Sequence, residues 1–355
     1  MGVLILKKGR GQSTKPRHRF SRCLPLLFCS IFLFSCQTSD DATAAAQQLA
    51  TTSTDLANYY SALSQLVTAD IALGDLQNTL IPHADVLPFP EATRTILNTT
   101  LSELQNRAEL AKSLQDLSSA FSKLTGSTAP ADVSTAAAKL GTELTTTKAL
   151  PDITKLGSPI SLPSAIGEAS KLIISLVQQH EERKVAPALN TTVNILKEMF
   201  SNEKNDYDSL NETYLILAES LANVCIDKHL VDNTSVLVPA LQPFSLTAHL
   251  SSTAATTTEL DRAIKTQVAR TRAALVDAHK KASTAMLQAI TDMSTRINEL
   301  ATNHHMTARG TPVTLTTVEK WISTANTYLT DASTNNSSTA ASTGSTTTAS
   351  KPAKK

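Results

Sequence analysis

Apolar residues recur at steps of three and four along most of this chain, and this spacing restricts the fold more than any other feature. The pattern begins with two rows that share one face: Leu49, Leu56 and Leu63, and Tyr59, Leu66, Leu73 and Leu80. Such spacing places apolar side chains along one side of an α-helix. No window alternates with a period of two and also carries β-branched and aromatic residues together. The sequence therefore predicts an all-α protein.

Prolines, glycines and capping residues divide this pattern into separate helices. We expect helices over about 42–81, 91–126, 131–149, 163–203, 206–230, 254–303 and 316–331. Pro187 lies inside the fourth of these and should kink it, because its ring removes a backbone hydrogen bond. The sixth begins with the capping box Thr256-x-x-Glu259 and would be about 75 Å long at 1.5 Å per residue. These lengths predict an elongated bundle of long antiparallel helices.

The two ends of the chain differ in composition from the middle. Residues 1–35 hold seven Lys or Arg and no Asp or Glu, so the rest of the chain has 25 basic against 31 acidic residues, about −6. An acidic body disfavours a nucleic-acid partner, because binding phosphates needs clustered cations. Residues 332–350 hold twelve Ser or Thr. We therefore expect a leader at 1–35, a tether at 36–41, one helical-bundle domain at 42–331 and a disordered tail with a basic end at 332–355.

An uncharged apolar stretch follows the basic start of the leader. It runs for 12 residues from Cys23 to Phe34, too short for a bilayer span of about 20, and is typical of a secretory signal peptide. It ends in Leu33-Phe34-Ser35-Cys36, which resembles the lipobox of bacterial lipoproteins, although Phe34 is larger than the usual residue there. The resemblance implies that Cys36 carries a diacylglycerol and that the chain is cut before it, which would leave a stable membrane anchor.

The same resemblance bears on where the protein would be sorted. Gln37 after the lipidated cysteine favours the outer membrane where the host has one, and Asp40 and Asp41 resemble the acidic tethers that some bacteria use for surface display. An ordinary cleaved signal peptide and an uncleaved anchor are the alternatives. Myristoylation at Gly2 is disfavoured, because Leu6 occupies the position where that motif has Ser or Thr.

Motifs for catalysis or metal binding are incomplete in the remaining chain. His180-Glu181 begins like a zinc-protease helix, but Lys184 stands where the second histidine is needed. We interpret His304-His305 as a helix cap, and Asp227-x-His229 and Asp277-x-His279 as solvated helix faces. No nucleophile elbow, phosphate-binding loop or Cys-x-x-Cys pair is present. The sequence predicts no catalytic residue, metal ligand or cofactor.

Cys225 is the one cysteine that would remain free after lipidation and removal of the leader. Leu221, Val224 and Ile226 surround it, so we expect it to pack in the core as a small hydrophobe.

These patterns favour a lipid-anchored cell-envelope protein that is a non-catalytic binding or scaffold module. Its partners would be the membrane, through lipid on Cys36, and an envelope protein or wall polymer, with self-association along the long helices. An alternative is a membrane-active protein resembling long-helix pore-forming toxins, although Pro239 and Pro243 make its uncharged segment 233–258 a poor span. The candidate membrane-contact residues in that segment are Val236, Leu237, Val238, Leu241, Phe244 and Leu246. An enzyme whose site has no local motif is a third alternative.

Overall fold

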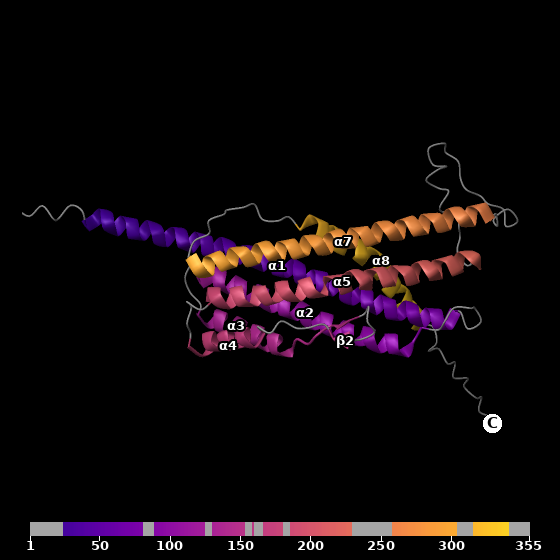
Figure 1. Cartoon of the computed structure of the whole chain (residues 1–355), viewed down its shortest axis with the longest axis horizontal. Coiled ribbons are helices and arrows are strands. Elements are labelled where there is room, and N and C mark those ends of the chain that lie inside the picture. The colour runs from indigo at the N-terminus through magenta and orange to yellow at the C-terminus, as the bar shows by residue number, and fades with distance from the viewer. Residues whose placement is uncertain are drawn as a thin grey trace, which may run out of the picture.

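A computed structural model describes residues 24–80, 89–124, 130–152, 158–159, 166–179, 185–228, 258–303 and 315–340. Seven helices lie in these ranges: α1 (Leu24–Leu80), α2 (Glu91–Leu124), α3 (Pro130–Thr146), α4 (Ile166–Gln179), α5 (Val185–Asp227), α7 (Thr258–Asn303) and α8 (Thr316–Ala340). The strands β1 (Pro151–Asp152) and β2 (Ser158–Pro159) have two residues each and pair antiparallel between α3 and α4. The helices form an elongated bundle, which confirms the predicted fold class (Figure 1).

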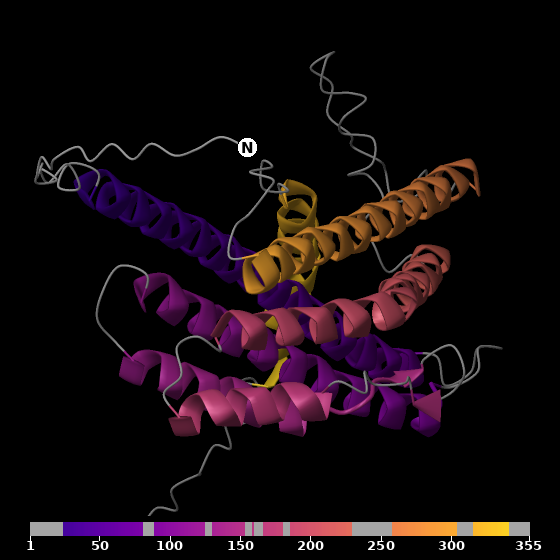
Figure 2. The same ribbon diagram turned by 60° about the vertical axis from the view of Figure 1, so that its left-hand side comes forward.

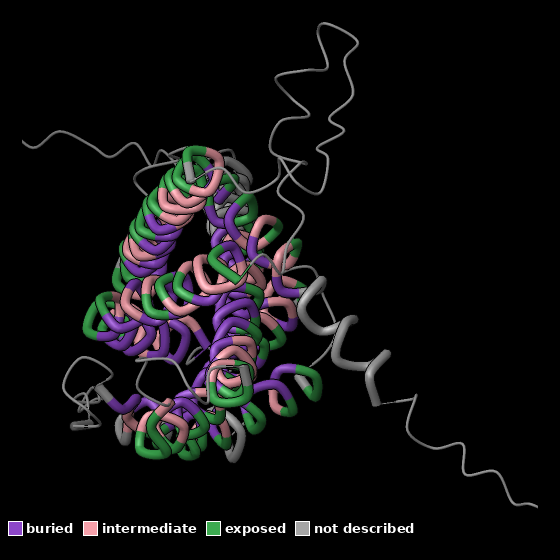
Figure 3. Tube along the Cα trace, turned by 90° about the vertical axis from the view of Figure 1, so that its right-hand side faces the viewer, coloured by how far each residue is buried: buried purple, intermediate pink, exposed green. Residues whose placement is uncertain are grey.

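Helix α1 is the common element of the bundle, because it packs against α2, α5, α7 and α8. It forms an antiparallel hairpin with α2, while α5 and α7 lie side by side in opposite directions (Figures 1 and 2). Helices α3 and α4 pack against each other, and α3 also packs on α2. Along the tube in Figure 3, buried stretches face inward and exposed stretches face outward. The described helices therefore enclose a continuous core that runs along α1.

The predicted apolar rows form this core. Leu49, Leu56, Leu63 and Leu66 on α1 are fully buried, as are several leucines on the facing side of α2: Leu104, Leu110, Leu114 and Leu117. Burial of a leucine side chain contributes about 1.5–3 kcal/mol, so this seam is a large share of the apolar stabilisation. Among the described helices, none has a stretch long and apolar enough to cross a membrane.

Two helices extend beyond their expected ends. The backbone of α1 begins at Leu24 and passes through 36–41 without a break, where we expected a tether. Between Pro25 and Gly74 the sequence contains neither proline nor glycine, so nothing interrupts the helix. Helix α8 reaches Ala340, inside the tail expected to be disordered from 332, because no proline or glycine occurs before Gly344.

The region around Pro187 differs from our prediction in two ways. Pro187 is the third residue of α5 and does not kink a helix interior, because its missing N–H falls in the first turn, where no intrahelical acceptor exists. The break expected between 203 and 206 is also absent, since α5 is continuous. The polar residues there include Glu203 and Asp206, which are buried and do not form a loop.

Candidate functional site

The few aromatic side chains of the bundle gather where α1, α5, α7 and α8 meet. Six rings lie there with little or no exposure to solvent: Tyr59, Tyr60, Phe200, Tyr207, His279 and Trp321. The Tyr59 ring centroid lies 5.6 Å from that of Phe200 and 5.1 Å from that of Trp321. Aromatic contacts at such distances add about 0.5–1.5 kcal/mol each beyond area burial. This aromatic cluster joins four helices at the centre of the bundle.

His279 connects the aromatic cluster to a buried carboxylate. Its Nε2 lies 3.0 Å from the Tyr59 hydroxyl, and its Nδ1 lies 3.0 Å from Asp208 Oδ1, although the Nδ1–H is not well aligned with that oxygen. Ser283 Oγ donates to Asp208 Oδ1 at 2.8 Å, and Lys204 Nζ donates to Asp208 Oδ2 at 2.9 Å. We call Tyr59, His279, Asp208, Ser283 and Lys204 the histidine network. Sequence reasoning assigned His279 to a solvated face, which was wrong.

The protonation of the histidine network follows from burial and from its hydrogen bonds. Burial lowers the pKa of His279, and the nearby Asp208 only partly offsets this, so the ring is neutral near pH 7. Burial alone would raise the pKa of Asp208, but the close contact with His279 and the hydrogen bonds from Lys204 and Ser283 outweigh it and lower that pKa to about 2. The carboxylate facing Nδ1 favours a proton on that nitrogen, and Nε2 then accepts from the Tyr59 hydroxyl.

A Tyr–His–Asp series could transfer protons if a substrate reached it. Among the described residues, Tyr59, His279 and Asp208 do not line the pocket between α1 and α8 or the cavity between α1, α2 and α5. Because its hydrogen bonds join α1 to α7 and α7 to α5, we interpret the histidine network as a structural connection between these helices.

This interpretation predicts how stability depends on pH. The pKa of Asp208 is lower in the folded protein than its ordinary 3.8, so its stabilisation is present above about pH 4 and is lost as pH falls towards 2. A shift of this size corresponds to about 2 kcal/mol. Urea unfolding should show that wild type loses about 2 kcal/mol more stability than Asp208→Asn does as the pH falls from 4 to 2.

The control for this experiment is Asp277→Asn, because Asp277 is exposed on α7 and pairs with Lys281. It should follow wild type throughout. An Asp208→Asn curve parallel to that of wild type would show that the carboxylate has no special stabilising contact.

A second buried network joins α2 to α5 and to the loop after α3. Arg107 is fully buried, and its Nε donates to Glu203 Oε2 at 2.9 Å, while its Nη1 and Nη2 donate to the carbonyls of Glu103 and Lys148, each at 3.0 Å. The Tyr207 hydroxyl donates to Glu203. Burial alone would lower the pKa of Arg107, but the contacts with Glu203 outweigh burial and raise this pKa above its ordinary value. The side chain therefore stays charged. We call Arg107, Glu103, Glu203, Tyr207 and Lys148 the arginine network.

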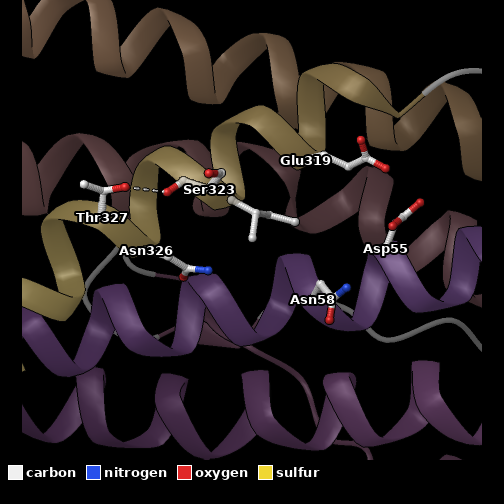
Figure 4. Close-up of a pocket in the computed structure, with 7 residues that line it drawn as sticks. Asp55, Asn58, Glu319, Ser323, Asn326 and Thr327 are labelled. Atoms are coloured by element: carbon white, nitrogen blue, oxygen red, sulfur yellow. Dashed lines mark hydrogen bonds between the residues drawn. The ribbon is translucent and has the colours of Figure 1, made fainter.

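The candidate binding site on the surface is a pocket between α1 and α8, with a volume of about 580 Å³. Figure 4 shows Asp55 and Asn58 of α1 facing the α8 residues that line it: Glu319, Ser323, Asn326 and Thr327. Partial burial raises the pKa of Asp55, and the carboxylate of Glu319 raises it further. The pocket therefore offers hydrogen-bonding groups and negative charge to a polar partner.

This α1/α8 pocket lacks the groups needed for metal chemistry. Across the parts of the chain that the structure describes, no three His, Cys, Asp or Glu side chains are grouped so that they could hold a metal ion. The arrangement places hydrogen-bonding groups and two carboxylates, those of Asp55 and Glu319, around the α1/α8 pocket.

Only some of the residues singled out from the sequence lie within the described ranges. Cys36 is within the α1 helix, but only its backbone is described, and Cys225 is half-buried, less enclosed than expected. The segment from Val236 to Leu246 lies outside the described residues, as do the motifs at 180–184 and 304–305. His229 also lies outside them, whereas Asp227 is exposed and pairs with Lys265. Neither Cys225 nor Asp227 is among the described residues that line the α1/α8 pocket.

One local signal could have indicated the two buried networks. Several of their members stand four residues apart on one helix, the spacing that brings side chains together: Glu103 with Arg107, Glu203 with Tyr207, Lys204 with Asp208, and His279 with Ser283. The same spacing occurs on solvated helix faces, as Asp277 and Lys281 show. Their burial depends on contacts between residues far apart in sequence.

Comparisons with protein-family models, curated proteins and solved structures find no match to this chain. Its function is therefore argued from its residues and their arrangement.

Proposed function

We propose that this chain is a lipid-anchored cell-envelope protein whose helical bundle is a non-catalytic binding or scaffold module. The observation that supports a scaffold best is the length of its connected helices. Helices α1, α5 and α7 have 57, 43 and 46 residues, so α7 alone is about 69 Å long at 1.5 Å per residue. The histidine network links all three. Such a bundle offers extended surfaces for binding and can span a long distance from its anchor.

The course of α1 supports anchoring close to a membrane. Ala42 and Ala45, shortly after Cys36, already pack in the core. Ala42 comes six residues after Cys36, which corresponds to a rise of about 9 Å along the helix. If Cys36 carries lipid, the bundle would sit against the membrane surface and would not hang from a long tether.

The anchor can be tested directly with a fatty acid that carries a detectable tag. Cells expressing wild type should incorporate the label into this protein, and Cys36→Ser should lose it together with retention in the membrane fraction. Cys225→Ser is the matched control and should stay labelled, because Cys225 lies on α5, far along the chain. An unlabelled wild-type protein would contradict the proposed anchor and leave the bundle without one.

The binding role can be tested separately at the α1/α8 pocket. A photo-crosslinking residue at Asn58, in the pocket, should capture an envelope protein or wall polymer in living cells. The same residue at Thr284, exposed on α7, serves as the control. If Asn58 captures no more than Thr284 does, the α1/α8 pocket is not the contact surface.

A further inference from the structure

A second cavity, of about 310 Å³, lies between α1, α2 and α5. We call it the Asp70 cavity, after the one charged residue among the described residues that line it. Its walls are mostly hydrocarbon and include Phe89, Ile96, Leu97, Leu210 and Leu217. Cavities that bind small molecules in proteins begin at about 300 Å³ and have this combination of apolar walls and few polar groups.

Asp70 is an unusual residue for such a place. Its side chain is 1% exposed, and its Oδ1 has no hydrogen-bond partner among the described residues. Burial raises the pKa of this carboxyl to about 7. Asp208, by comparison, has contacts to His279, Lys204 and Ser283. A buried carboxylate without partners destabilises a fold, so Asp70 contributes nothing to stability that would explain its presence.

The charged and titratable neighbours of Asp70 do not neutralise it. Arg94, on the adjoining stretch of α2, pairs with Asp75 and Glu91. Tyr214 of α5 is close enough that Asp70 adds to the effect of burial in raising the tyrosine pKa, which keeps the phenol neutral. The carboxylate therefore lacks a cation within the described part of the protein.

The Phe89 side of the Asp70 cavity is tightly fixed. The Phe89 N–H donates to Asn78 Oδ1 at 2.7 Å, and the Phe89 ring lies against Gly74, where a Cβ atom would come within 2.6 Å of the ring. Only glycine allows this ring to approach α1 so closely. The aromatic wall of the cavity is thus positioned by two residues of α1, on the same helix as Asp70.

We propose that the Asp70 cavity binds a small protonated amine with an apolar body, whose ammonium group pairs with Asp70 and whose hydrocarbon part fills the cavity. Benzene fills an apolar cavity of about 150 Å³, so a hexyl or phenylethyl group fits the available volume. An ammonium group supplies the donors and the positive charge that the carboxylate lacks. The inference is independent of the anchor and of the α1/α8 pocket.

Three probes of similar size test this proposal on the full chain by calorimetry at pH 8. Hexylamine is protonated there, as a lysine side chain is, whereas hexanol is neutral and hexanoate is negative. We expect hexylamine to bind at least about tenfold more tightly than hexanol, because a hydrogen bond to a charged group is stronger than a neutral one. Hexanoate should not bind.

Two variants separate the charge from the cavity. Asp70→Asn keeps the shape and should reduce the affinity for hexylamine to that for hexanol. Leu217→Trp should fill the cavity and abolish binding of both probes. Asp277→Asn, an exposed acid elsewhere, should bind as wild type does.

A titration of wild type keeps the test valid if a variant fails to fold. Hexylamine affinity should fall between pH 8 and pH 6, as protons compete for Asp70, while hexanol affinity stays constant. The proposal is overturned if wild type binds hexanol as tightly as hexylamine, or if the preference for the amine persists in Asp70→Asn.

Discussion

Replacing Arg107 with alanine is expected to destabilise the folded protein by about 3–5 kcal/mol, which is a large part of the stability of an ordinary domain. The guanidinium is fully buried and contacts Glu203, whose side chain is 2% exposed, and Glu103, whose side chain is 7% exposed. Alanine would leave these carboxylates buried without their cation, and it would also remove a donor to the Lys148 carbonyl. Urea unfolding at pH 7 measures the loss.

Two further variants test whether the loss of stability comes from the buried charge. Arg94→Ala removes a more exposed ion pair with Asp75 and should cost much less stability than Arg107→Ala, because water screens exposed charges. Arg107→Met combined with Glu203→Leu removes both main charges and should recover most of the lost stability, because apolar side chains of similar size can replace a buried pair. If Arg107→Ala costs no more than Arg94→Ala, the arginine network does not hold α2 and α5 together.

Replacing Asp70 with asparagine should have the opposite effect and stabilise the protein, by up to about 4 kcal/mol at pH 8. Burial raises the pKa of Asp70 from 3.8 to about 7, so the folded protein holds this proton more tightly than the unfolded chain does. The stability that the folded protein gains from binding a proton at Asp70 is fully present below about pH 4 and is lost as the pH rises through about 7. Asparagine does not ionise and so avoids this loss.

Urea unfolding at pH 4, 6 and 8 tests this prediction. The stability gained by Asp70→Asn should increase across these values and then become constant above pH 8. Asp277→Asn should show little gain at any of them, since its carboxylate is exposed and paired. A loss of stability in Asp70→Asn at pH 8, or a gain that does not change with pH, would contradict an unpaired buried carboxylate.

The sequence predicts those parts of the fold that depend on neighbours along the chain. The apolar rows identify the buried face of α1, and the expected second helix, 91–126, agrees with α2, because Pro90 and Gly126 stand next to its ends. The break expected within α5 was wrong, because burial at that point depends on a contact between residues far apart in the sequence. Glu203 is polar, but its partner Arg107 is 96 residues away, and no local pattern reveals that a charge will be neutralised inside the bundle.

The candidate sites differ in the same way. Cys36 is recognisable from four consecutive residues, whereas the α1/α8 pocket brings together Asp55 and Glu319 from opposite ends of the bundle sequence. Asp70 could have been noticed, because it interrupts the apolar run Leu66-Val67-Thr68-Ala69-Asp70-Ile71-Ala72-Leu73 at a position on the buried face. That signal indicates an unusual acid, but only the packing of α2 and α5 against α1 shows that a cavity lies beside it.

The central position of α1 has a consequence for when the protein can fold. The hydroxyl of Tyr59 meets a histidine 220 residues later, and Trp321 of α8 completes the same cluster. Contacts between such distant residues form slowly, because a long loop must close before any of them is made. Helix α1 can therefore complete this cluster only after both α7 and α8 have been synthesised.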